Sequence, residues 1–170
     1  MAKIPTDKIK NLSPETLLGM LNRMKKFLKK HPIVIKMFKE YDVPIEELDL
    51  IPMKFGDLDV SARTDHGIIT FNLKLLNDGD FHKDYMYAVH EIEHFLQQTT
   101  GDGPTKGAED GDYLKNPYEQ SGFQRQIEYL DHMYGDDEAE RYTEHLLEHH
   151  DKDGKEKEKL KEKLMEKVDE

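Results

Sequence analysis

Residues 82–100 read HKDYMYAVHEIEHFLQQTT, and this stretch decides how the rest of the chain is interpreted. Its apolar residues recur at intervals of three and four, which predicts a helix that ends at Gly101. At about 100° per residue, one side of this helix is apolar, whereas the opposite side carries His90, His94 and Gln97. The helix can therefore bury one face and direct two imidazoles into a cleft on the other.

The two histidines belong to the pattern His-Glu-x-x-His, formed here by His90, Glu91 and His94. Residues four apart lie one turn apart on the same face of a helix, so both imidazoles can bind one ion while Glu91 stands beside it. Zinc suits such ligands because it accepts tetrahedral geometry and leaves a fourth position for water. The sequence therefore predicts one Zn2+ ion per chain, bound by His90 and His94.

A third ligand is expected further along the chain, where residues 113–119 read YLKNPYE and open the next predicted helix. Glu119 follows His94 by 25 positions, and a loop of that length can return the chain to the metal. Glu119 also fits a plain capping role, because Asn116 is a good N-cap and Pro117 a good first helical residue. The ligand role and the capping role do not exclude each other.

Two competing motifs are present. Residues 145–149 read HLLEH, which is the inverted pattern His-x-x-Glu-His on another predicted helix. Only a Lys/Glu-rich tail follows to supply a third ligand, so a solvated polar helix face is the favoured interpretation of this stretch. The central motif can also be interpreted in the inverted sense, with Glu93 as the base.

The stretch from about Leu48 to Leu130, with the central motif followed by Tyr-Leu-x-x-Pro-x-Glu, resembles the small gluzincin zinc metallopeptidases of the minigluzincin kind. The resemblance implies that Glu119 joins the two histidines as a zinc ligand. It also implies that Glu91 is the general base, which takes a proton from zinc-bound water as a peptide bond is hydrolysed. The expected partner is a peptide or protein substrate.

The same resemblance implies further features of a cleft. A strand just before the zinc helix, here Gly67 to Leu73, would bind an extended substrate through its backbone. Larger gluzincins often place an Asp four residues after the ligand Glu to hold a zinc histidine, but this chain has Phe123 there, which leaves that partner unassigned. The oxyanion needs a donor, and the candidates are Tyr113, Tyr118, Tyr129 and His132.

The expected fold class is α+β. N-terminal helices, one of them beginning after Ser13, precede a small and mostly antiparallel sheet; the central zinc-binding helix and C-terminal helices follow. Residues 160–168 carry a thin apolar stripe, typical of a solvated charged helix or a partner-binding one. We expect one compact metallopeptidase domain over 1–150 and a charged helical tail over 151–170. The domain divides into N-terminal helices at about 1–45, a catalytic core at 46–135 and an extra helix at 136–150.

Composition limits the partners. The 170 residues carry a net charge of -11, which disfavours nucleic acid, and no apolar run is long enough to span a membrane. Cys is absent, so disulfides and cysteine zinc clusters are excluded. With no signal peptide evident, a cytoplasmic location is expected. The charged C-terminal helices offer a possible partner surface, and one of the chain's ends can block the cleft and make the enzyme latent.

Two other function classes stay open. A non-catalytic zinc-binding structural or interaction module would keep the ion without turnover, although such a site is expected to fill its fourth position with protein. A helical protein in which the motif is accidental would bind no metal.

Overall fold

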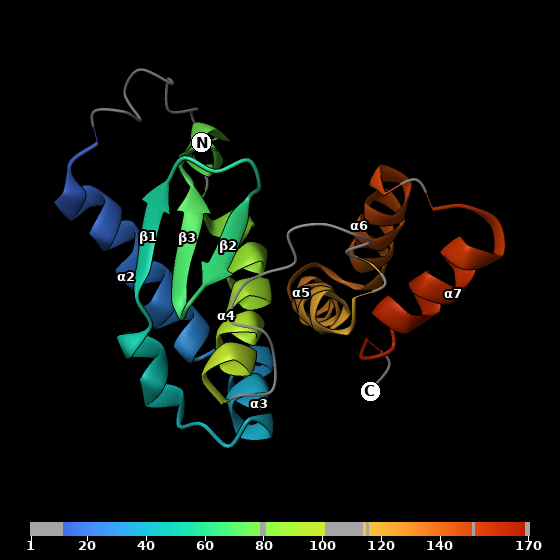
Figure 1. Ribbon diagram of the computed structural model, residues 1–170, viewed down its shortest axis with the longest axis horizontal. Coiled ribbons are helices and arrows are strands. Elements are labelled where there is room, and N and C mark those ends of the chain that lie inside the picture. Colours follow the sequence, from blue (N-terminus) through green and yellow to red (C-terminus); the bar gives the residue numbers. More distant parts are fainter. Residues whose placement is uncertain (1–11, 79–80, 101–113, 115, 151, 169–170) are drawn as a thin grey trace. The chain divides into compact units, whose positions relative to one another are not determined.

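The computed structural model describes residues 12–78, 81–100, 114, 116–150 and 152–168 (Figure 1). The chain folds as two compact units, Met1–Gly107 and Ala108–Glu170, which are described separately below. The predicted α+β class is confirmed, whereas the domain boundaries expected from the sequence stay a prediction. Within the described residues, no helix is both long and apolar enough to cross a membrane.

The first unit begins with two helices, α2 (Pro14–Lys29) and α3 (Pro32–Glu40). Ser13 caps α2 as expected, because its hydroxyl accepts a hydrogen bond of 3.1 Å from the backbone N–H of Thr16. His31 caps α3 in the same way through Nδ1, which accepts from the N–H of Ile33. Proline at the first helical position favours both starts, since its missing N–H has no helical partner there.

A three-stranded sheet follows, built from β1 (Met53–Gly56), β2 (Ala62–Asp65) and β3 (Ile68–Asn72) in the order β1-β3-β2. β2 and β3 form an antiparallel hairpin, and its turn residues His66 and Gly67 both have positive φ, as two-residue turns of this kind require. β3 runs parallel to β1.

The sheet is therefore mixed rather than mostly antiparallel. The hairpin returns the chain between β2 and β1, so β3 pairs with strands on both sides and has the same direction as β1. β1 is also shorter than the apolar run over 48–55 predicted, because Ile45–Leu50 forms a 3₁₀ helix, η1. Strand order depends on contacts between distant residues, which local patterns do not contain.

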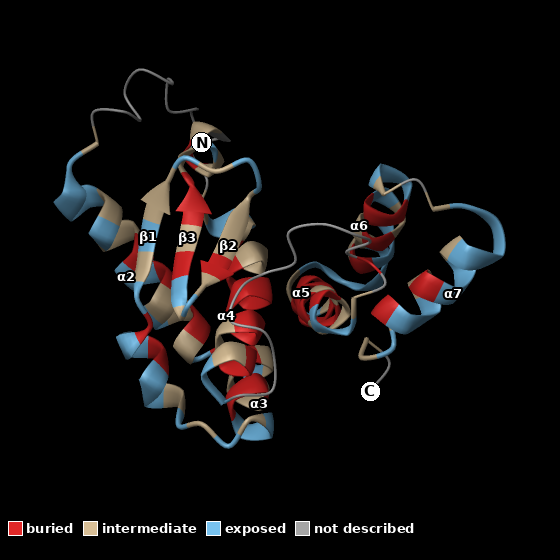
Figure 2. Cartoon of the chain, viewed as in Figure 1, coloured by how far each residue is buried: buried red, intermediate tan, exposed pale blue. Residues whose placement is uncertain are grey.

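The central helix α4 (Tyr85–Thr100) packs against β2 and β3, and two short 3₁₀ helices, η2 (Leu73–Asp78) and η3 (Phe81–Asp84), precede it. Figure 2 shows buried residues along most of α4, and its predicted apolar side does lie in the core. The core of this unit combines that side with apolar residues of α2, α3, η1 and β3. Its largest members include Met24, Leu28, Met37, Phe38, Leu48, Ile69, Phe71, Ile92 and Leu96.

The second unit is helical, with α5 (Pro117–Tyr134), α6 (Asp136–His149) and α7 (Gly154–Leu164). Gly135, at a φ of 98°, separates α5 from α6. α7 is not a fully solvated helix: Leu160 and Leu164 are buried, and Met165 and Val168 pack beside them. This core consists of Leu114, Ile127, Ala139, Leu146, Leu147, Leu160 and Leu164.

Candidate metal centre

The two histidines of the central motif lie side by side on α4. Both are buried, with 6% of His90 and 5% of His94 exposed, and their Nε2 atoms are 3.1 Å apart. Two nitrogens bound at about 2.0–2.1 Å to one tetrahedral ion lie about 3.3 Å apart. The imidazoles are therefore arranged to bind a single ion with little rearrangement.

Gln97 is a hydrogen-bond partner of His94. Its side-chain oxygen Oε1 lies 2.8 Å from His94 Nδ1 and can only accept, so this contact favours the tautomer with the proton on Nδ1 and the lone pair on Nε2. A second hydrogen bond of this kind orients a metal-binding imidazole. Gln97 thus supplies the partner that the resemblance left unassigned at Phe123. The sequence contained a signal for it, since Gln97 falls on the same helix face as the histidines.

Glu91 stands beside the pair. It is buried, and its Oε2 lies 4.0 Å from His90 Nε2. Its other oxygen, Oε1, accepts a hydrogen bond of 2.9 Å from the hydroxyl of Thr64 on β2. This is the position that a general base needs, next to a metal but separate from its nitrogen ligands. Thr64 had no signal in the sequence, because its contact depends on how β2 packs on α4.

Glu93 points to different surroundings. It is also buried, and its Oε1 accepts a hydrogen bond of 2.8 Å from the hydroxyl of Tyr41, which follows α3. At about 100° per residue, Glu91 and Glu93 flank the helix face that carries the histidines, one on each side. This contact counts against the inverted interpretation of the central motif, in which Glu93 is the base.

In the second unit, the predicted capping arrangement is present at the start of α5. The side chain of Asn116 accepts from the N–H of Tyr118 at 2.9 Å, and Pro117 is the first helical residue. Glu119, in the first turn, is only 4% exposed, whereas an acidic residue that serves only a helix start is usually solvated. Its rival Glu128 accepts from Arg125 at 3.2 Å, so its charge is neutralised by an ion pair.

His90 and His94 of the first unit and Glu119 of the second are described residues whose side chains could serve as metal ligands. All three are buried. Two nitrogens and one carboxylate oxygen form a donor set that suits zinc, although other divalent ions accept such ligands as well.

The inverted motif on α6 has different surroundings. Leu146 and Leu147 are buried in the core of the second unit, whereas His145 and His149 are exposed. Glu148 forms an ion pair of 3.3 Å with Lys157 on α7. These five residues therefore form a polar helix surface above two core leucines, as the sequence favoured.

The predicted oxyanion donors differ in exposure. Tyr129 is buried, Tyr118 and His132 are exposed, and Tyr113 lies outside the described residues.

Sequence reasoning missed Tyr87, which is one helical turn before Glu91 on α4. Burial raises the pKa of its phenol above the usual value, with a smaller opposing effect from a hydrogen bond to Ser61. Tyr87 therefore stays a protonated hydrogen-bond donor near neutral pH.

The prediction that the strand Gly67 to Leu73 binds substrate through its backbone is wrong. β3 is the central strand, and its backbone pairs with β1 and β2 on its two sides, so it has no free edge for an extended peptide. Among the described strands, β2 lies at the edge of the sheet that contacts α4. The error follows from the strand order, because the last strand in sequence before the helix is not the last strand in space.

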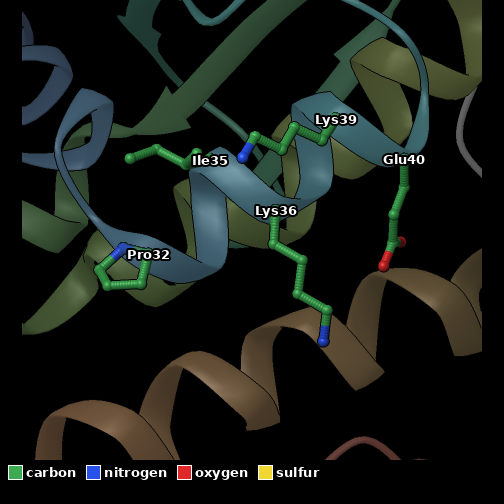
Figure 3. A pocket seen from close by; sticks show the side chains of 5 residues that line it. All are labelled: Pro32, Ile35, Lys36, Lys39 and Glu40. Atoms are coloured by element: carbon green, nitrogen blue, oxygen red, sulfur yellow. The ribbon is translucent and has the colours of Figure 1, made fainter.

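A shallow hollow on α3 is lined by Pro32, Ile35, Lys36, Lys39 and Glu40 (Figure 3). Its lining contains no histidine and only one carboxylate, so it does not provide a metal site of the kind predicted.

No family model, curated protein or solved structure matches this chain.

Proposed function

We propose that this chain is a zinc-dependent peptidase, in which His90, His94 and Glu119 hold the ion and Glu91 is the general base. The observation that carries the proposal is the histidine pair on α4. The two Nε2 atoms are 3.1 Å apart, Gln97 favours one tautomer of His94, and a buried carboxylate stands 4.0 Å from His90 Nε2. An accidental motif has no reason to combine these three features.

Glu119 is the proposed third ligand. Its support is its burial, its membership of the group of possible metal ligands and its place in the Tyr-Leu-x-x-Pro-x-Glu element. Three protein ligands leave the fourth position of a tetrahedral ion open, which separates catalytic from structural zinc sites. A carboxylate also offsets part of the charge of the ion, which an amide would not do.

When bound, zinc supplies a Lewis acid that polarises the scissile carbonyl and lowers the pKa of water at its open position. Glu91 accepts the proton of the attacking water through Oε2, the oxygen nearer to His90 Nε2. The water oxygen first bonds to the carbonyl carbon; the carbon–nitrogen bond then breaks as the carbonyl re-forms, and Glu91 returns the proton to the leaving nitrogen. Water supplies every atom added to the products.

β2 is the proposed binding strand for the substrate backbone. The N–H of Asn72 donates to the carbonyl of Ser61, and alternation along an antiparallel pair then turns Arg63 and Asp65 toward β3 as well. The N–H and C=O of Ala62 and Thr64 are directed to the free edge. Gln98 Nε2 already donates to the Thr64 carbonyl at 2.8 Å, so an extended peptide would pair mainly with Ala62.

The experiment compares Glu91→Gln with Glu93→Gln in untagged protein. Both changes keep an acceptor oxygen on a buried side chain of α4, but Glu91 has an oxygen 4.0 Å from His90 Nε2 whereas Glu93 accepts from Tyr41. We expect Glu91→Gln to retain zinc, measured by mass spectrometry, and to lose at least about 10²-fold in turnover of a peptide library. Glu93→Gln should keep both properties. Zinc without hydrolysis in the parent protein would favour the non-catalytic module, and absence of zinc would refute the proposal.

The third ligand is tested by zinc competition titrations of Glu119→Gln and Glu128→Gln. Both residues lie on α5 and both are buried, but Glu128 pairs with Arg125. We expect Glu119→Gln to weaken zinc binding by at least about 10-fold, because a neutral amide is a poor ligand. Loss of affinity in Glu128→Gln alone would assign the ligand to Glu128 instead.

A further inference from the structure

Thr64 is the residue of β2 that contacts the proposed general base. Its side chain is fully buried, and its hydroxyl Oγ1 lies 2.9 Å from Glu91 Oε1 and 3.1 Å from the backbone carbonyl oxygen of Glu91. A hydroxyl has one proton to donate. The side-chain oxygen of Glu91 is the nearer of the two acceptors.

This contact distinguishes the two carboxylate oxygens of Glu91. Oε1 accepts from Thr64, whereas Oε2 lies 4.0 Å from His90 Nε2. We propose that Thr64 is a positioning residue, whose hydroxyl fixes the rotation of the Glu91 carboxylate so that Oε2 faces the metal position. The inference rests on the proposed function, since it gives Thr64 a role through the base that hydrolysis needs.

The backbone of Thr64 is itself held in place. The Thr64 carbonyl accepts a hydrogen bond of 2.8 Å from Gln98 Nε2, and Gln98 Oε1 accepts one of 3.2 Å from the N–H of Gly67. Gln98 thereby fastens the β2–β3 hairpin to α4 two turns beyond Glu91. Thr64 also pairs with Ile69 in the sheet, and its branched side chain has few rotamers. A donor fixed in this way can restrict a carboxylate that would otherwise rotate.

Burial alone does not require a carboxylate partner. Thr143 on α6 is equally buried, and its hydroxyl donates to the backbone carbonyl of Ala139 at 2.8 Å, four residues earlier in the same helix. Thr64 has a carbonyl within reach as well, yet its closest acceptor is the Glu91 side chain. Thr143 is therefore a matched control for the loss of a buried threonine hydroxyl.

The kinetic test uses the zinc-loaded full chain. Thr64→Val keeps the shape of the side chain and removes its donor, so we expect kcat to fall by at least about 10-fold while KM and zinc affinity stay within about twofold. Thr64→Ser, which restores the hydroxyl, should recover kcat to within about threefold of the parent. Thr143→Val should leave kcat unchanged. An unchanged kcat in Thr64→Val, or a fall in Thr64→Val that Thr64→Ser does not reverse, overturns the proposal.

A second arm does not depend on hydrolysis. Urea unfolding of the metal-free chain compares the loss in midpoint caused by Thr64→Val in the parent and in a Glu91→Met background. The loss should shrink by at least about half when the carboxylate is absent, whereas the loss caused by Thr143→Val should be equal in both backgrounds. Equal losses for Thr64→Val would show that its hydroxyl serves only the carbonyl, and would overturn the proposal. A parent that hydrolyses no peptide would refute the peptidase function, while this arm would still decide whether Thr64 holds the carboxylate.

Discussion

Two stretches of this chain carry two histidines and a glutamate at metal-binding spacing, and their surroundings differ. On α4, His90 and His94 are buried with their Nε2 atoms 3.1 Å apart, and Glu91 lies beside them. On α6, His145 and His149 are exposed, and the glutamate between them pairs with a lysine of α7. Spacing places side chains on one face of a helix, but burial and neighbouring hydrogen bonds decide whether they meet.

The two motifs also differ in how their histidines are held in the absence of a metal. Gln97 favours the proton on Nδ1 of His94, which leaves Nε2 ready to bind. On α6, His149 instead has its ring 5.3 Å from that of His150, a contact that leaves its tautomer undefined. The entropy of ordering the α4 ligands is therefore already part of the folding free energy, whereas the α6 ligands would have to be ordered by the metal.

The largest expected effect separates the two motifs directly. His94→Ala should weaken zinc binding by about 10³-fold, because it removes one of three proposed ligands. His149→Ala, the matched change on α6, should leave the affinity within about twofold. Zinc competition titrations on both variants measure this difference, and circular dichroism checks that each still folds. Loss of zinc from the α6 variant alone would reverse the assignment.

The second prediction concerns what the α6 motif does instead. Leu147 is fully buried in the core of the second unit, so Leu147→Ala should lower the free energy of unfolding by about 3 kcal/mol. His145→Ala, on the exposed side of the same motif, should change it by less than about 0.5 kcal/mol. Urea unfolding of both variants measures the contrast. Comparable losses would mean that the exposed side of the motif also carries structure.

The smallest expected change in zinc affinity concerns the hydrogen bond between Gln97 and His94. Gln97→Leu should weaken zinc binding by about 10-fold, near the lower end of the range for outer hydrogen-bond partners of metal ligands. Gln98→Leu is the control, because Gln98 bonds the β2–β3 hairpin rather than a histidine. That variant should lose stability and keep its zinc affinity within about twofold. Equal losses of zinc affinity in Gln97→Leu and Gln98→Leu would show that Gln97 acts only by stabilising the fold.

Local patterns predicted the helices well, because their signals lie within a few residues. Ser13 and Asn116 cap the helices they were expected to cap, and Gly135 follows the last residue of α5. The face of α4 that carries His90, His94 and Gln97 also follows from sequence spacing alone. These features depend on helical periodicity and capping chemistry, which a single sequence contains.

The remaining features depend on contacts between distant residues. The parallel pairing of β1 with β3, the contact of Thr64 with Glu91 and the burial of Leu160 and Leu164 all require knowledge of which elements pack together. The prediction of the substrate-binding strand failed for this reason, because the hydrophobic pattern of β3 does not show that β3 lies in the middle of the sheet. The thin apolar stripe of the Lys/Glu-rich tail likewise does not show from the sequence that it packs against α5 and α6.

Binding of one metal ion at the central motif can be observed in a crystal structure of the untagged, zinc-loaded chain, with data collected on both sides of the zinc absorption edge. We expect an anomalous peak at about 2.0–2.2 Å from the Nε2 atoms of His90 and His94 and from a carboxylate oxygen of Glu119. A peak at His145 and His149, or none at the α4 histidines, would refute binding at this motif.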